Sequence, residues 1–164
     1  ITRCGNVRQL GSDRWHAAIG APSLFPGNAL LICQMGTATT IDTVLPNDGR
    51  YEFLGGRILP GPTMMQNALI QNTRCRPGND GKMTPSPNNT TDAIMTGIIE
   101  SHLGVISCAV REIRQKGFEP KIVLAGGAAP CLAPFIQEQY PEAVLKHNLV
   151  LRGLSLRAQE KKGS

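Results

Sequence analysis

Hydrophobic positions in this chain fall into short runs that are separated by glycine, proline and asparagine. Residues 29–34 are a short, mostly apolar run that ends before a glycine corner, which is typical of a buried strand. Residues 37–45 are rich in Thr, Ile and Val, which favour strands. The tripeptide Asn47-Asp48-Gly49 is a hairpin turn signal. We therefore predict three consecutive strands, over residues 29–34, 37–45 and 51–59.

Other segments carry the spacing of helices. Residues 90–117 place apolar side chains on one side, which predicts a long helix capped by Asn89 or Thr90. A short helix is predicted over residues 13–21, and residues 76–89 are rich in Pro, Gly and Asn, which predicts a long loop. The remaining predicted elements are a helix ending near Asn72, a strand over 121–125, a helix to about Gln139, a short strand near Val144 and a helix over 149–159.

The order of these elements is three strands in a meander, helices, a strand and further helices. This order predicts an α/β fold with a mixed sheet and flanking helices. The 164 residues suffice for one domain with its own core, and the sequence shows no internal repeat. Hydrophobic residues make up 41% of the chain and aromatic residues only 4%, so aliphatic side chains must form most of the core.

The net charge of +5 predicts a mildly basic surface that can attract anionic ligands such as nucleotides. Nucleic acid binding would need a dense stripe of Lys and Arg, and the main cluster is the tail Lys161-Lys162, so we do not expect it. No apolar run approaches the roughly 18 residues that span a bilayer. A soluble protein without a membrane partner is therefore expected.

Five cysteines occur without a CxxC pair, so the sequence predicts neither a disulfide framework nor a zinc site. Cys33 and Cys108 lie in apolar runs and are expected in the core. Free thiols indicate a reducing compartment, so we expect a cytoplasmic protein. His16, His102 and His147 have no metal-ligand spacing, and none is assigned a role.

Two glycine corners follow predicted buried strands. At Gly36-Thr37, backbone amides and the Thr hydroxyl could approach phosphate oxygens. Gly126-Gly127 opens a helix, whose N-terminus favours anions. Each corner is also consistent with an ordinary tight turn, but two corners on one sheet favour a nucleotide cleft. A third glycine pair, Gly55-Gly56, lies inside a strand and predicts a bulge or a close backbone approach.

The segment Gly11-Ser12-Asp13-Arg14 is the sharpest candidate for chemistry. A carboxylate beside a guanidinium stays ionised and can accept a proton from a substrate hydroxyl. Arg14 could hold a substrate carboxylate or phosphate through two parallel hydrogen bonds. The same residues are also consistent with a helix cap at Asp13 followed by an exposed ion pair. The local pattern supports the two interpretations equally.

Six strings occur in order along the chain: LGSDRW, GTATTID, GGRILPG, NTTDAI, LAGG and LVLRGL. Each is weak alone, but the ordered set, from about Leu10 to Leu156, resembles type III pantothenate kinases, also called the Bvg accessory factor family. The resemblance implies the actin-like, ribonuclease H-like fold of the sugar kinase–Hsp70 superfamily, built from two similar halves. Residues 1–164 then correspond to the C-terminal half of such a kinase.

The resemblance implies ATP-dependent phosphorylation of pantothenate to 4'-phosphopantothenate, the first step of coenzyme A biosynthesis. It also implies a homodimer that needs Mg²⁺ and a monovalent cation, K⁺ or NH₄⁺. In the family's motifs Asp13 corresponds to the proton acceptor. Residues that correspond to substrate contacts are Gly11, Ser12, Asp13, Arg14 and Thr90. Thr37 corresponds to an ATP contact, and we add the glycine corners Gly36, Gly126 and Gly127 to the expected ATP-binding residues.

Three departures from the family pattern bear on the activity expected of this chain. Gln34 stands where the family has an aspartate that binds the monovalent cation, and a neutral amide keeps an oxygen but loses the charge. Ala128 stands where the family often has an acid. The family's N-terminal DxGNT phosphate loop, which binds ATP, does not occur in these residues. The 164 residues alone are therefore expected to be weakly active or inactive.

Two other functions stay open at this point. The first is a non-catalytic or regulatory member that binds ligands with the same fold, which the residues Gln34 and Ala128 motivate. The second is a transcriptional accessory factor, which the family's older name suggests. The sequence contains no helix-turn-helix signature to support the second one.

Overall fold

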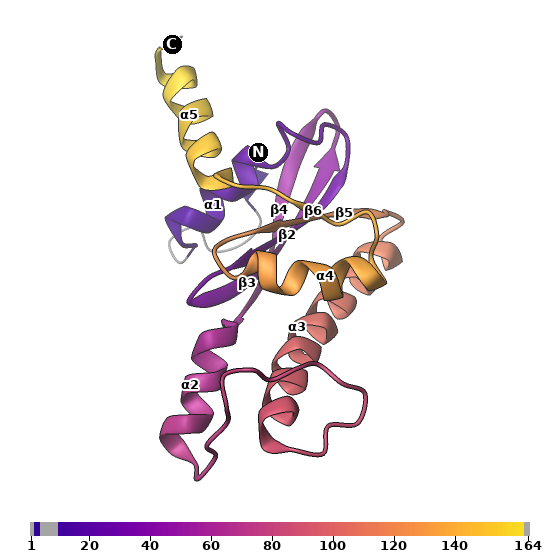
Figure 1. Ribbon diagram of the computed structural model, residues 1–164. Coiled ribbons are helices and arrows are strands. Elements are labelled where there is room, and N and C mark those ends of the chain that lie inside the picture. The colour runs from indigo at the N-terminus through magenta and orange to yellow at the C-terminus, as the bar shows by residue number, and fades with distance from the viewer. Residues whose placement is uncertain (1, 4–9, 163–164) are drawn as a thin grey trace.

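A six-stranded mixed sheet with helices on both faces forms the protein (Figure 1). The computed structural model describes residues 2–3 and 10–162. Three strands form an antiparallel meander, and two further strands continue the sheet in parallel beside the first strand of that meander. The strand order is β1-β4-β3-β2-β5-β6. The elements are β1 (Thr2–Arg3), α1 (Ser12–Gly20), β2 (Ala29–Met35), β3 (Ala38–Asn47), β4 (Arg50–Pro60), α2 (Pro62–Asn72), α3 (Thr90–Gln115), β5 (Pro120–Ala125), α4 (Ala129–Gln139), β6 (Val144–Leu145) and α5 (Leu149–Lys162).

The predicted meander, long helix and closing elements are all present, so the expected α/β fold is confirmed. The hairpin between β3 and β4 turns at Asp48 and Gly49, whose φ angles are 44° and 74°. Strand β1 was not predicted, because two residues are too few to show a pattern. It pairs in parallel with β4 at the edge of the sheet.

Helix α1 begins without the cap that one interpretation of its sequence placed at Asp13. Gly11 occupies the N-cap position, and no side chain caps the helix. Asp13 lies within the first turn, where its negative charge interacts favourably with the helix dipole. The interpretation of Asp13 as a helix cap is therefore wrong.

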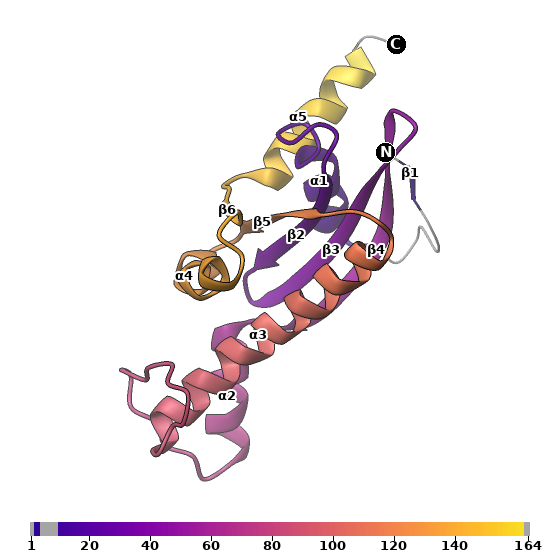
Figure 2. The same ribbon diagram turned by 90° about the vertical axis from the view of Figure 1, so that its right-hand side faces the viewer.

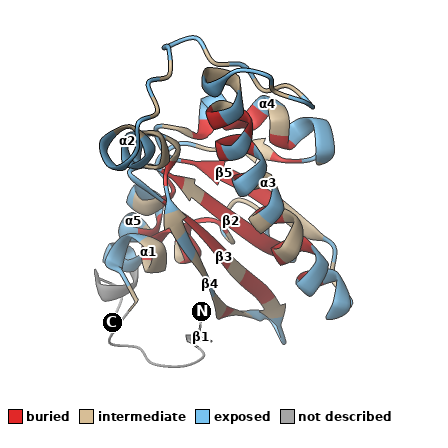
Figure 3. Ribbon diagram, turned by 90° about the horizontal axis from the view of Figure 1, so that it is seen from below, coloured by how far each residue is buried: buried red, intermediate tan, exposed pale blue. Residues whose placement is uncertain are grey.

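Two apolar cores lie on the two faces of the sheet, and the strands between them are buried (Figure 3). On β2, Leu31 and Cys33 belong to the core under α3 and α4, whereas Leu30 and Ile32 belong to the core under α1 and α5. This alternation follows from the two-residue period of a strand. It fixes which face each polar side chain of β2 and β3 can reach.

Helices α1 and α5 pack so closely that glycine is needed at the contact. A Cβ atom at Gly153 of α5 would lie 1.9 Å from the backbone oxygen of His16 in α1. A Cβ atom at Gly20 would lie 2.4 Å from the backbone oxygen of Leu149. The string LVLRGL thus lies where α5 packs on α1.

Helix α2 and the N-terminal part of α3 extend together beyond the end of the sheet (Figure 2). The loop that joins them contains no helix or strand, as predicted for residues 76–89. Its backbone donates hydrogen bonds to α3, from Lys82 to Asp92 Oδ1 (2.8 Å) and from Thr84 to Thr96 Oγ1 (3.1 Å). These bonds fix the middle of the loop against the helix.

Among the described residues, α3 is the one helix that is long and apolar enough to span a membrane, judged by length and composition alone. Its sequence is not one continuous apolar run, because Asp92, Glu100 and Arg111 interrupt it. Nine of its residues are buried, among them Ile98, His102 and Ile106, and it packs on β2, β3 and β5. Its apolar character is explained by this position across the sheet.

The cysteines follow the prediction only in part. The cysteines of the described residues are all free, and Cys33 is fully buried. Cys108 is only half-buried, and Cys131 is exposed. Cys4 lies outside the described residues.

Candidate functional site

The two glycine corners lie side by side at one edge of the sheet. Strands β2 and β5 are parallel neighbours, with Gln34 opposite Ala125. Just beyond them, the backbone nitrogen of Ala128 donates a hydrogen bond of 3.0 Å to the backbone oxygen of Met35. Gly126 has a φ of 95°, and a Cβ atom there would lie 2.3 Å from the Met35 oxygen. The two corners were expected on one sheet, and the structure places them at the same edge of it.

A third backbone segment joins these corners. The Gly61 nitrogen donates a hydrogen bond of 2.8 Å to the Thr37 oxygen. A Cβ atom at Gly61 would lie 1.9 Å from the backbone oxygen of Gly36, so no other residue could approach so closely. This contact brings the start of α2, at Pro62, next to the Gly36-Thr37 corner.

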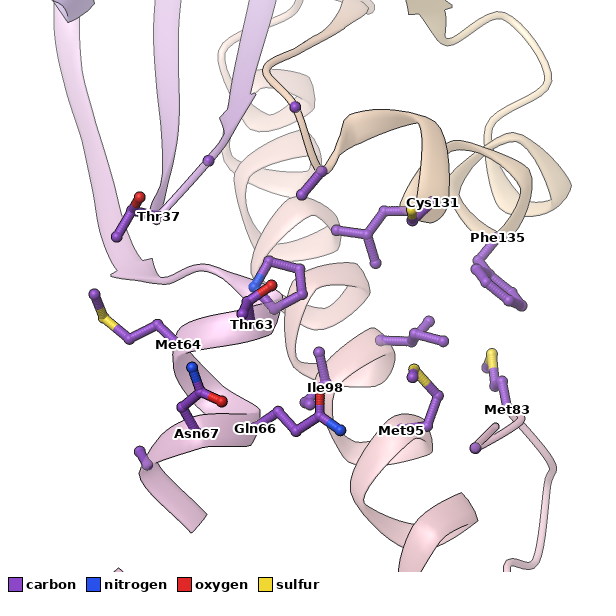
Figure 4. A pocket seen from close by; sticks show the side chains of 18 of the residues that line it. Thr37, Thr63, Met64, Gln66, Asn67, Met83, Met95, Ile98, Cys131 and Phe135 are labelled. Carbon is purple, nitrogen blue, oxygen red and sulfur yellow. The ribbon is translucent and has the colours of Figure 1, made fainter. Parts of the chain in front are cut away.

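A cavity of about 1220 Å³ opens in front of the corners (Figure 4). Gly36, Thr37 and Gly127 line the end that is nearest the sheet. Polar side chains of α2 line one wall, and apolar side chains from the loop, α3 and α4 line the other. Representative wall residues are Thr63, Gln66 and Asn67 on the polar side and Met83, Met95 and Phe135 on the apolar side.

This cavity has the features of a nucleotide site. The Gly36-Thr37 and Gly126-Gly127 corners are exposed, and α4 begins directly after the second corner. The first amides of α4 are engaged, from Ala129 to the Gly126 oxygen (3.1 Å) and from Cys131 to the Ala128 oxygen (3.2 Å), and Pro130 has no N–H. Attraction to phosphate therefore comes from the dipole of the helix, and the Thr37 hydroxyl adds a donor. The apolar wall suits a flat, weakly polar base. Cys131, in the first turn of α4, is exposed in the same cavity.

A second group of polar side chains lies on the opposite face of the sheet, under α1. Arg14 Nε donates to both carboxylate oxygens of Asp42, each at 3.1 Å, and Arg14 Nη2 donates to Asp42 Oδ1. The side chains of Arg14 and Asp42 are only 13% and 1% exposed. The Arg14 guanidinium also lies over the Phe53 ring, 5.9 Å from its centroid. Asp42 thus occupies the position that we expected a substrate anion to take on Arg14.

Burial and charge act on this pair in opposite directions. Burial raises the pKa of Asp42, and the hydrogen bond and positive charge of Arg14 partly offset that rise. The pKa of Arg14 is raised, chiefly by its hydrogen bond to Asp42. The exposed carboxylate of Asp13 is close enough for its charge to raise both pKa values further. The sequence suggested Asp13 as the partner of Arg14, but the structure pairs Arg14 with Asp42, and the described residues hold no Asp13 ion pair.

Gln34 and Thr40 lie next to this pair and face each other across β2 and β3. Gln34 follows Leu30 and Ile32 on the α1 face, and Thr40 precedes Asp42 on that face. Within the described residues, the buried atoms Gln34 Nε2 and Thr40 Oγ1 have no hydrogen-bond partner of ordinary geometry. The Thr40 hydroxyl is nevertheless near enough to help to lower the pKa of Asp42.

The predicted site residues therefore separate into two groups. Gly36, Thr37 and Gly127 line the cavity, while Gly126 packs on Met35 behind it. The segment from Gly11 to Arg14 and the side chain of Gln34 belong to the α1 face. Gln34 lies two residues before Gly36, so β2 connects the groups. Thr90 lies in neither group: it is exposed at the start of α3.

His16 and Ser12 contact each other at the start of α1. The Nδ1 atom of His16 lies 2.6 Å from the Ser12 backbone oxygen and 3.1 Å from Ser12 Oγ. A carbonyl oxygen only accepts, so Nδ1 carries the proton that it donates there. His16 thus stabilises the first turn of α1, which agrees with leaving it without a chemical role.

Asp42 is a residue that sequence reasoning missed. Asp42 is a lone acid within the β-branched run of β3, and a buried carboxylate nearly always has a partner. That signal indicated a buried ion pair but not its partner, because Arg14 lies 28 residues away in the sequence. Gly56 lies directly opposite Asp42, and the bulge expected at Gly55-Gly56 is present between Thr43 and Val44 of the neighbouring strand.

Comparison with known proteins shows close relatives. The sequence model described as type III pantothenate kinase matches residues 2–112. A type III pantothenate kinase of Aromatoleum aromaticum is 41% identical over 166 residues, which cover 96% of this chain and 64% of that protein. One of Herminiimonas arsenicoxydans is 42% identical over 154 residues, which cover 91% of this chain and 57% of that protein. The chain thus spans 57% to 64% of the length of these two relatives.

Solved structures of similar shape confirm the fold. A Campylobacter jejuni protein described as a Baf family transcriptional activator superposes with a TM-score of 0.69 at 21% identity, covering 99% of this chain and 70% of that one. The Alp12 filament structure superposes with a TM-score of 0.56 at 16% identity, covering 89% and 53%. These likenesses show the fold alone, and they agree with the expected α/β class with a mixed sheet and flanking helices. From the extent and identity of the sequence matches, the chain belongs to the type III pantothenate kinase family.

Proposed function

We propose that this chain is the C-terminal, substrate-binding half of an enzyme that phosphorylates pantothenate with ATP. The family membership supports the reaction. The observation that carries the proposal in the structure is the cavity at the sheet edge, where Gly36, Thr37 and Gly127 meet. Two exposed glycine corners and a helix N-terminus at one opening are suited to the phosphates of a nucleotide.

The proposed roles follow from the two groups of residues. ATP lies with its base along the apolar wall and its phosphates toward Gly36, Thr37, Gly126 and Gly127. Pantothenate lies along the segment from Gly11 to Arg14. The family resemblance also assigns Thr90 to the substrate, but within this chain Thr90 lies apart from that segment. The two ligands meet over the end of β2, because that strand is shared by both groups.

The reaction needs few protein groups. The primary hydroxyl oxygen of pantothenate forms a bond to the γ-phosphorus of ATP, and the bond from that phosphorus to the β–γ bridging oxygen breaks. ADP leaves, and Asp13 accepts the hydroxyl proton. Asp13 is exposed and free of an ion pair among the described residues, so its carboxylate is available to a substrate. Positioning and charge neutralisation supply most of the catalysis in phosphoryl transfer.

Magnesium enters this proposal with the nucleotide. Mg²⁺ keeps several waters and is commonly held by substrate phosphates with one or two carboxylates. No group of three or more metal-ligating His, Cys, Asp or Glu side chains occurs among the described residues. When it is bound, Mg²⁺ neutralises the charge that develops on the phosphates.

The residues around position 34 do not fit a monovalent cation. Gln34 offers a neutral oxygen, and its amide nitrogen is a donor that is buried without an acceptor among the described residues. The nearest buried carboxylate, Asp42, is already bound to Arg14. We therefore assign no step to K⁺ or NH₄⁺, and we expect equal rates of ADP formation in K⁺, NH₄⁺ and Na⁺ salts. A clear stimulation by K⁺ or NH₄⁺ alone would contradict this.

We also propose a cytoplasmic homodimer, on the family resemblance. Helix α2 supports association because none of its residues is buried and two apolar ones, Met64 and Leu69, are 42% and 38% exposed. Light scattering on the purified full-length protein should give the mass of two chains. A monomer at micromolar concentration would contradict this part of the proposal.

The reaction is tested with the full-length protein that carries these residues. We expect ADP formation that requires pantothenate, and a product that is one phosphate heavier by mass spectrometry. Asp13→Asn keeps the shape of the side chain but cannot accept the proton, so kcat should fall by about 100-fold or more. A wild type that forms no ADP with pantothenate would contradict the proposal.

One observation favours a second candidate, a non-catalytic member that binds ligands. The orphaned amide of Gln34 lies close to Thr40 and Asp42, at the point where the two ligands are proposed to meet. Calorimetry separates the candidates: binding of ATP and pantothenate without any turnover supports the binding protein. Restored turnover in Gln34→Asp would then identify position 34 as the cause.

A further inference from the structure

We propose that Asp42 is a positioning residue for the substrate half of the site, and that it acts by fixing Arg14 and the segment before it. This inference rests on the proposed function. The chemistry is assigned to Asp13, which is exposed and has no ion pair of its own among the described residues. Its position must therefore be set by the residues that anchor the start of α1.

Arg14 is the anchor next to Asp13. Its Nε and Nη2 atoms are both bound by the Asp42 carboxylate, which fixes the plane of the guanidinium. The Phe53 ring, with its centroid 5.9 Å away, supports the guanidinium from the sheet. The Asp42 side chain is 1% exposed, so water hardly competes for these bonds. Two adjacent residues of the segment are thus held relative to the centre of the sheet.

Strand β4 is shaped to admit the Asp42 carboxylate. Gly56 lies directly opposite Asp42, and a Cβ atom there would lie 2.2 Å from Asp42 Oδ1 and 2.3 Å from the Ile41 oxygen. A bulge lies beside this pair, and Gly55 has a φ of 110° that side chains rarely adopt. Bulges re-aim neighbouring side chains. In the glycine pair of the string GGRILPG, Gly56 leaves space for the Asp42 carboxylate, and Gly55 adopts the positive φ found beside the bulge.

Arg14 keeps one group for a ligand. Asp42 uses Nε and Nη2, and Nη1 has no hydrogen-bond acceptor within residues 10–162. A guanidinium fixed on one side and open on the other can bind a substrate oxygen without losing further side-chain freedom. Asp42 therefore sets both the direction of this donor and the place of the neighbouring Asp13 carboxylate.

The test compares Asp42→Asn with Glu112→Gln in the full-length protein. Both changes remove the charge of a carboxylate that pairs with an arginine, but Glu112 binds Arg57 on the other face of the sheet. In Asp42→Asn we expect kcat/KM for pantothenate to fall by about 100-fold, in part through a higher KM for pantothenate, because the Arg14 donor that binds the substrate is no longer held in place. The KM for ATP should stay within about twofold, because the glycine corners are not touched. Glu112→Gln should leave all constants unchanged.

A loss of folded protein is distinguished by the pattern of constants. Partial unfolding lowers kcat in proportion to the folded fraction and leaves both KM values alone, so that pattern would overturn the role. Gly56→Ala supplies a second variant, since it displaces Asp42 without touching Arg14, and it should show the same selective rise in KM for pantothenate. Hydrogen exchange gives a readout independent of turnover: the amides of residues 12–16 should exchange faster in Asp42→Asn, and not in Glu112→Gln.

The outcomes separate this role from the proposed function. A wild type that forms no ADP overturns the proposed function and this role with it. An active wild type whose folded Asp42→Asn variant keeps kcat/KM for pantothenate within about threefold overturns the role alone. Unchanged exchange at the start of α1 in that variant also overturns it.

Discussion

The two faces of the sheet each carry an arginine–carboxylate pair, and the pairs differ in burial. Arg14 and Asp42, under α1, are 13% and 1% exposed. Arg57 and Glu112, at the rim of the α3 face, are 32% and 54% exposed. Desolvation makes a buried charge depend on its partner, whereas an exposed ion pair competes with water on equal terms. The same chemistry should therefore matter greatly on one face and little on the other.

The faces also differ in how their remaining polar groups are satisfied. Under α3, Thr39 and His102 are fully buried and hydrogen-bonded to each other at 3.0 Å. Under α1, Gln34 Nε2 and Thr40 Oγ1 are buried without a partner of ordinary geometry among the described residues. A face whose buried polar groups are all hydrogen-bonded is typical of a core. Buried polar groups without a partner are typical of a face where a ligand binds. This difference favours the α1 face as the place where a substrate binds.

The largest expected effect comes from removing one partner of each ion pair. Asp42→Ala leaves a buried guanidinium without its carboxylate, so the free energy of unfolding should fall by about 3–5 kcal/mol. Glu112→Ala should cost at most about 1 kcal/mol, because both partners are accessible to water. Urea unfolding monitored by circular dichroism gives both values. Equal decreases in the free energy of unfolding of the two variants would contradict the proposed difference between the two faces.

The second comparison replaces glycine by alanine on each side. Gly56→Ala places a methyl group against Asp42 and the Ile41 backbone, so it should destabilise the protein by about 1–3 kcal/mol. Gly97 lies exposed within α3, with nothing within 4 Å of its added Cβ. Gly97→Ala should therefore stabilise the protein by about 0.5–1 kcal/mol. Thermal unfolding of both variants checks the opposite signs.

A smaller effect is expected from pH on the α3 face. His102 Nδ1 lies 2.8 Å from the Ile98 oxygen, so it donates there, and Nε2 then accepts from the Thr39 hydroxyl. Burial lowers the pKa of His102, and the hydrogen bond to Ile98 only partly offsets this. Because the folded pKa is lowered, the unfolded chain binds more protons below about pH 6.5. Stability from this group is complete above that pH and is lost as pH falls toward the folded pKa.

The pH effect is measured as the unfolding midpoint between pH 5 and 8. His102→Gln should remove this contribution to the slope below about pH 6.5. His147, which is exposed near the end of β6, provides the matched control. An identical pH profile in wild type and His102→Gln would show that the buried ring does not govern the slope.

The sequence predicted the fold well because the fold depends on local patterns. The hairpin at Asp48-Gly49, the apolar run of β2 and the breaks at Gly36 and Gly126 are each visible within a few residues. That the two corners are neighbours was not predicted, because it depends on the parallel pairing of β2 with β5. The short strand β1 escaped prediction because its existence depends on pairing with β4 rather than on its own residues.

The site was predicted less completely because its contacts are non-local. Asp13 and Arg14 were found as a pair by their adjacency, yet adjacent residues of a helix point in different directions. Arg14 instead meets Asp42, and Asp42 needs Gly56 on a third element. Each of these residues lies in one of the ordered strings LGSDRW, GTATTID and GGRILPG. Only the folded chain shows that these three segments contact one another. Thr90, by contrast, was placed with the substrate and lies apart from both groups.

The last and smallest effect concerns accessibility rather than stability. Cys131 is exposed in the cavity on the α3 and α4 side, whereas Cys33 is fully buried and burial raises the pKa of its thiol. Maleimide should therefore label Cys131 rapidly and leave Cys33 unreacted, as peptide mass spectrometry would show. ATP at ten times its dissociation constant should slow labelling of Cys131 about tenfold by mass action, and Cys108, outside the cavity, should label at an unchanged rate. If ATP does not slow the labelling of Cys131, the nucleotide does not bind in this cavity. The α1 face is then the remaining candidate for the nucleotide site.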